Sequence, residues 1–153
     1  MALNIVAIRE AIAAVVESAV SNSEHPANVY AYPTDSPALP AIMLLPAPFD
    51  DGAYVNYWGT FSRSVCAIGL RLELRVPGND IDSARVLDVY LSELIPDVID
   101  GLLGAAADPT LGGLCESVIP RAGAVPARFA AADDLNRTWL SSSVALEVQA
   151  RRS

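Results

Sequence analysis

A run of alternating residues between Val65 and Val76 sets the strictest limit on the fold. One set of positions is apolar throughout, while the other set becomes charged toward its end. The two sets are Cys66, Ile68, Leu70, Leu72, Leu74 and Val76, and Val65, Ala67, Gly69, Arg71, Glu73 and Arg75. A strict period of two predicts a half-buried strand of an antiparallel or mixed sheet, about 40 Å long at the usual rise per residue. Such a strand often projects beyond its own domain.

Apolar residues at three- and four-residue spacing predict a helix over residues 5–20, with Asn4 as its N-cap. Arg9, Glu10 and Glu17 fall on the side away from its apolar stripe. A second helix follows the turn at residues 77–80, where Asn79 or Asp80 can cap it. Because proline suits only the first turn of a helix, Pro96 predicts a break near Ile95 and a short third helix over residues 96–103. Residues 104–113 form a loop in this interpretation.

Short strands are predicted on both sides of these helices. Candidates are residues 29–32, 41–45, 116–122 and 139–150, and the surrounding prolines favour short or edge positions. Residues 49–61 are interpreted as a hairpin or an extended arm. Together these elements predict an α+β fold, a mostly antiparallel sheet with helices packed on one face plus a projecting hairpin or arm. The length of 153 residues fits a single domain, residues 1–153.

The charge pattern limits the classes of partner. The net charge is −8, and all ten basic residues are arginine. No basic patch of the kind that grips phosphates stands out. The acidity serves solubility, or it keeps the surface from holding polyanions. No apolar stretch is long enough to span a bilayer, and the first residues lack a signal peptide's basic start, so we expect no membrane partner and a cytosolic product that stays whole.

Residue types that carry catalysis are scarce. The single histidine, His25, is expected to be a solvated loop residue, and without lysine there is neither a phosphate-binding loop of the Gly-Lys-Ser type nor a Schiff-base lysine. The acidic pairs at residues 50–51 and 133–134 are interpreted as solvated turns. Cys66 is expected to be a buried, inert thiol, whereas the sequence does not define the surroundings of Cys115. The sequence does not exclude a disulfide between the two, but the expected cytosolic compartment argues against it. We therefore predict no enzyme, no cofactor and no metal site.

An aromatic cluster is the best candidate for a functional surface. Its residues, with the arginine that follows them, are Tyr54, Tyr57, Trp58, Phe61 and Arg63. They either pack on their own sheet or anchor an interface between subunits, because tyrosine and tryptophan dominate interface hot spots. A platform for stacking nucleic-acid bases is disfavoured by the acids at residues 50–51.

The order of these segments resembles the tail terminator proteins of long-tailed bacteriophages, and more loosely the neck proteins beside them. The resemblance spans nearly the whole chain. It rests on the opening helix, on the segment YWGTFSR at 57–63 running into the long strand, on the helix DIDSARVLDVYL at 80–91, on DVIDGLL at 97–103 leading to TLGG at 110–113, and on the closing strand at 144–149. None of these is a catalytic motif.

The resemblance implies a structural virion protein, assembled in the host cytoplasm and located in the tail or neck. Such proteins form a ring, usually of six copies, that ends polymerisation of the tail tube and joins the tail to the neck. The implied partners are other copies of the chain, the tail tube protein and a neck or head-completion protein, with DNA passing through as cargo without sequence-specific binding. Two alternatives stay open: a neck or head-completion protein of the same particle, or a small ligand-binding or enzymatic domain.

Overall fold

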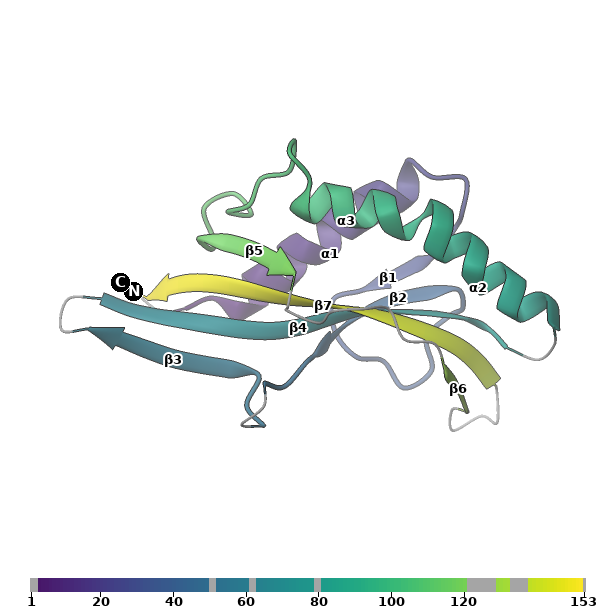
Figure 1. Cartoon of the computed structure of the whole chain (residues 1–153), viewed down its shortest axis with the longest axis horizontal. Helices are drawn as coiled ribbons and strands as arrows, with labels where there is room; N and C mark the ends of the chain where they lie inside the picture. The colour runs from purple at the N-terminus through teal and green to yellow at the C-terminus, as the bar shows by residue number, and fades with distance from the viewer. Residues whose placement is uncertain are drawn as a thin grey trace.

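The computed structural model describes residues 3–49, 52–60, 63–78, 81–120, 129–132 and 138–152. Within those ranges three helices pack on one face of a seven-stranded sheet (Figure 1). In chain order the elements are α1 (Ile5–Ser21), β1 (Asn28–Tyr30), β2 (Ala41–Pro46), β3 (Val55–Thr60), β4 (Arg63–Pro77), α2 (Ile81–Glu93), α3 (Ile95–Leu103), β5 (Ser117–Pro120), β6 (Phe129–Ala132) and β7 (Thr138–Arg152). The predicted α+β fold with a mostly antiparallel sheet is confirmed.

The long strand β4 and its partner β7 form the spine of the sheet. They pair antiparallel from Ser64 opposite Arg152 to Pro77 opposite Trp139. The main strand order is β1-β2-β4-β7-β5, with β3 also on β4 and β6 also on β7. Among these described pairs, only β1–β2 is parallel. The predicted strands at 29–32, 41–45, 116–122 and 139–150 correspond to β1, β2, β5 and β7, and β5 is an edge strand as Pro120 indicated.

Gly69 marks the point where β4 changes its partner on the edge away from β7. Its N–H donates to the Tyr54 carbonyl at 2.7 Å, and its carbonyl accepts from the Ala47 N–H at 2.9 Å. Before Gly69, β4 pairs with β3, and after it β4 pairs with β2. The β3–β4 hairpin therefore lies at one end of the sheet, and β1 and β2 lie toward the other.

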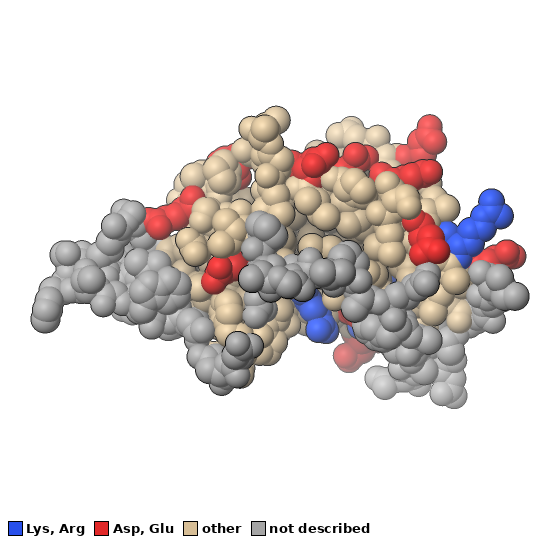
Figure 2. All heavy atoms as spheres, viewed as in Figure 1, with Lys and Arg blue, Asp and Glu red and all other residues tan. Residues whose placement is uncertain are grey.

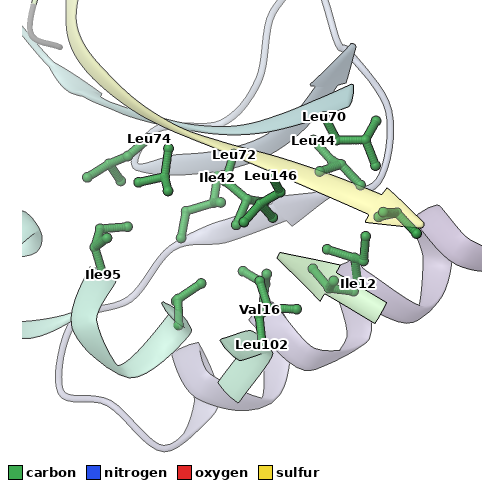
Figure 3. Packing of buried hydrophobic residues seen from close by; sticks show 14 of the residues in the cluster. Ile12, Val16, Ile42, Leu44, Leu70, Leu72, Leu74, Ile95, Leu102 and Leu146 are labelled. Carbon is green, nitrogen blue, oxygen red and sulfur yellow. The ribbon is translucent and has the colours of Figure 1, made fainter. Parts of the chain in front are cut away.

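The apolar set of the β4 alternation forms the floor of the core. Leu70 and Leu74 are at most 1% exposed, and Leu72 is 5% exposed. Figure 3 shows sheet side chains facing those of the helices, including Ile12 and Val16 from α1. Burial of such a side chain contributes roughly 1.5–3 kcal/mol, so this row supplies much of the driving force for folding.

The opposite face of β4 is less exposed than the alternation predicts. Arg71 is exposed, but Ala67 and Glu73 are each only 2% exposed. Glu73 accepts a 3.0 Å hydrogen bond from Arg75, whose guanidinium lies 4.4 Å from the ring centroid of Trp139. The prediction that these positions face solvent is therefore wrong for Ala67 and Glu73. The face of the sheet away from the helices is itself partly buried, and the Glu73 carboxylate has Arg75 as its ion-pair partner there.

Helix α1 begins as predicted, with the Asn4 side chain accepting from the Ala7 N–H at 3.0 Å. Its apolar stripe is confirmed at three residues that are fully buried: Ile8, Ile12 and Val16. Arg9, predicted to lie on the polar side, is instead 4% exposed. Its Nε donates to the Ala31 carbonyl at 2.9 Å and its Nη2 to the Leu44 carbonyl at 2.6 Å, and burial lowers the pKa of the guanidinium. Arg9 thus joins α1 to the β1–β2 segment.

The break at Pro96 is also confirmed, since α2 ends at Glu93 and α3 begins at Ile95 with the proline in its first turn. The predicted caps Asn79 and Asp80 lie outside the described residues. Strand β6 was not predicted, because its sequence Phe-Ala-Ala-Ala carries no alternation. Among helices in the described part of the chain, none combines the length and apolarity needed to cross a membrane.

Candidate assembly surface

The predicted aromatic segment forms the edge strand of a hairpin at the end of the sheet (Figure 1). Tyr57 stands opposite Cys66 on β4, and Trp58 stands opposite Val65. Arg63, the first residue of β4, stands opposite Thr60. Tyr54 lies just before β3 and is 38% exposed. Phe61 lies outside the described residues. The other four predicted site residues are spread along one hairpin, with Tyr54 beside Gly69 at one end and Arg63 at the other.

The end of β7 extends the hairpin to three strands. Arg151 stands opposite Val65, in the same row as Trp58, and Arg152 stands opposite Ser64. We call residues 58–60, 63–65 and 151–152 the arm tip. The ribbon in Figure 1 shows this end of the sheet extending past the helices. Sequence reasoning missed Arg151 and Arg152 because the pairing of β7 with β4 joins residues nearly ninety positions apart.

The helical layer has the opposite charge. Its helices carry seven exposed carboxylates but only two arginines, of which Arg9 is buried and Arg85 exposed. The acids are Glu10, Glu17, Asp82, Asp88, Glu93, Asp97 and Asp100. Figure 2 shows Asp and Glu residues along this side of the molecule. The sheet end and the helical layer therefore differ in both charge and residue type.

A groove of about 400 Å³ lies between α1 and α3. Small residues, both apolar and polar, predominate in it, with one carboxylate on its α3 side. Its lining residues are Val15, Ser18, Ala19, Asn22, Asp97 and Gly101. The helices approach closely here, since a methyl group at Gly101 would come within 3.2 Å of Val15 Cγ1. We call this surface the α1–α3 groove.

His25 has a structural role rather than the solvated position that was predicted. Its side chain is 22% exposed, its Nε2 contacts the Glu93 carboxylate, and its ring lies 5.3 Å from that of Tyr90. The Tyr90 hydroxyl also donates to the Pro26 carbonyl at 2.7 Å. These contacts fasten the segment after α1 to α2, which is why the histidine is not free in solvent.

Groups that could support catalysis are few in the described ranges. Cys66 and Cys115 are both buried thiols, not joined in a disulfide, and burial raises the pKa of each, that of Cys115 to about 11. The Asp108 carboxylate accepts from the Thr110 hydroxyl and backbone and from Gly112, and these hydrogen bonds lower its pKa. No three histidine, cysteine or acidic residues of the described part gather closely enough to hold a metal ion. The acidic pairs at 50–51 and 133–134 lie outside that part.

A scan against protein-family models found no matching family, and a search of the curated proteins found no matching sequence. The role of the chain is therefore inferred from its own residues and geometry.

Proposed function

We propose that this chain is a structural virion protein of a long-tailed bacteriophage. It forms a ring, of six copies by the resemblance, at the head-proximal end of the tail tube, where it ends polymerisation and joins the tail to the neck. The observation that carries the proposal is the arm, a hairpin with Trp58, Tyr57 and arginines at the end of a long sheet. Aromatic and arginine side chains are the residue types that anchor protein interfaces.

The distribution of charge also supports this role. A net charge of −8 disfavours retention of DNA phosphates, so a ring of such subunits lets the genome pass. The arm and the helical layer are different surfaces of one subunit, as a head-to-tail ring requires. A neck or head-completion protein of the same particle would also need a negative net charge and two different interacting surfaces. The protein that it binds distinguishes these two roles.

The native mass of the purified chain, alone and mixed with its tail tube protein, tests the proposal. We expect a closed ring, either free or on the tube, and tubes that stop growing when the chain is added. A strict monomer under both conditions would contradict it. A ring that binds the neck protein but leaves tube growth unchanged would instead support the neck role.

A further inference from the structure

We infer that Arg9, Tyr32 and Tyr54 form a binding site for a carboxylate group. The site lies at the point where the pairing of β1 with β2 ends and the Arg9 side chain bridges the two backbones instead. The inference goes beyond the proposed ring and does not depend on it, because it concerns a ligand that a single chain can bind.

Arg9 is a buried cation without an anionic partner. Its side chain belongs to a residue that is 4% exposed, and its hydrogen bonds go to two neutral carbonyls. The ion pairs in the described ranges join His25 to Glu93 and Arg75 to Glu73, and neither includes Arg9. Charged side chains are almost never fully buried unless they are paired. An anion bound at Arg9 would therefore compensate the guanidinium charge.

One nitrogen of the guanidinium is left for a ligand. Nε and Nη2 donate to the Ala31 and Leu44 carbonyls, whereas Nη1 has no hydrogen-bond partner in the described part of the chain. The buried side-chain nitrogens and oxygens that lack a partner there belong to other residues, so Nη1 reaches the molecular surface. A carboxylate oxygen can approach Nη1 from solvent and accept a charge-assisted hydrogen bond.

Tyr32 and Tyr54 supply the walls of the site. The centroid of the Tyr32 ring lies 4.5 Å from Cζ of Arg9, and Tyr54 lies close enough to act on the guanidinium electrostatically. Val6, one turn earlier on α1, lies on the same side of the helix as Arg9. These three are among five large apolar side chains that are exposed in the described part of the chain. Exposed apolar clusters mark binding sites, and this one lies around a cation.

A carboxylate fits these donors better than a phosphate does. Because Nε and Nη2 of Arg9 already donate to the backbone, the fork of two free nitrogens that arginine offers to phosphates is not available. The apolar walls also suit the hydrocarbon stem of a carboxylic acid. The net charge of −8 disfavours polyanions such as nucleic acids.

A titration of the full chain with sodium acetate tests the site. Isotopically labelled arginine makes the side-chain Nε–H signals visible by NMR at neutral pH, and loss of one signal in Arg9→Lys assigns that of Arg9. Sodium chloride at the same ionic strength is the salt control, and the exposed Arg71 is the control within the chain. We expect a saturable shift of the Arg9 signal with acetate, with no matching shift in chloride or at Arg71.

Tyr32→Ala should weaken acetate binding roughly twofold to fivefold, because it removes the ring that stacks on the guanidinium. Val86→Ala is the matched control, since it removes an exposed apolar side chain from α2 with a similar exposed fraction, 39% against 44% for Tyr32. This control should leave the affinity unchanged. Equal weakening by both variants, or by neither, would contradict the site.

An Arg9 signal that does not move with acetate, or that moves equally with chloride, would overturn the inference. Tighter binding of inorganic phosphate than of acetate would also overturn it.

A dilution series without acetate identifies the source of the carboxylate. An Arg9 shift that grows with chain concentration and is reversed by acetate supports the site and places the carboxylate on a second copy. A signal that is independent of chain concentration but moves with acetate supports the site and assigns it to a free carboxylate. The native mass of the same samples reports the ring, so failure of the ring and failure of the site are distinguished.

Discussion

Nη2 of Arg9 lies 2.6 Å from the carbonyl oxygen of Leu44, so a buried guanidinium on α1 holds the backbone of β2. The same side chain reaches the Ala31 carbonyl and stacks 4.5 Å from the ring centroid of Tyr32. Replacement by Arg9→Met would leave two carbonyls without this donor. We expect a loss of about 1–3 kcal/mol in the free energy of unfolding, measured by urea denaturation.

Arg9→Lys is the control for that change. A lysine keeps the charge and one donor but cannot span both carbonyls, so an intermediate loss is expected. Equal stability of Arg9→Met and the unsubstituted chain would show that the two hydrogen bonds contribute nothing net.

Leu72→Asp should abolish folding. Leu72 is 5% exposed in the core beneath the helices, and a buried carboxylate there costs several kcal/mol against a total stability of about 5–15 kcal/mol. Soluble yield and the thermal unfolding midpoint measure the effect. Arg71→Ala, at the exposed neighbouring position, should fold normally unless Arg71 contacts another subunit. An unchanged midpoint for Leu72→Asp would mean that the register of β4 is wrong.

The double variant Tyr57→Ala with Trp58→Ala should fold yet assemble poorly. Both residues belong to the edge strand β3, and burial against a neighbour would contribute roughly 1.5–3 kcal/mol for each side chain. Circular dichroism reports the fold, while native mass and tail length report assembly, with longer tails expected. Unfolding of the double variant would instead assign the aromatics to the core of the monomer.

Alkaline pH should destabilise the chain partly through Cys115. Burial raises the pKa of its thiol from 9.0 to about 11, with a smaller contribution from the charge of Asp108. Since the unfolded thiol ionises first, the stabilisation is present below pH 9 and is lost as the pH rises toward 11. The difference in free energy of unfolding between the unsubstituted chain and Cys115→Ala should therefore change across this interval. A constant difference would contradict the shifted pKa.

Local patterns in the sequence predicted those parts of the fold that depend on neighbours in the chain. The alternation around Leu72, the cap at Asn4 and the break at Pro96 each reflect a period or a backbone restriction that acts within a few residues. Two of the residues that were placed wrongly, Arg9 and Glu73, are charged side chains whose burial depends on distant surroundings. These are the carbonyls of Ala31 and Leu44 for Arg9, and the Trp139 ring beside Arg75 for Glu73.

The candidate surface also combines features that local sequence patterns predict with features that depend on contacts between distant segments. Aromatic content and strand length indicated the arm, including Tyr57 and Trp58. Its arginines Arg151 and Arg152 became part of it only through the pairing of β7 with β4. The α1–α3 groove depends on the approach of Gly101 to Val15, which no single segment of the sequence reveals.

The position of β7 between β4 and the pair β5 and β6 has a consequence for synthesis on the ribosome. Strands β5 and β6 precede β7 in the chain, yet each pairs only with it among the described strands. The two halves of the sheet therefore cannot join until residues 138–152 have left the exit tunnel. Because closing such long-range pairs is slow, nascent chains should expose the unpaired edge of β4 and depend on chaperones until this segment has emerged and paired.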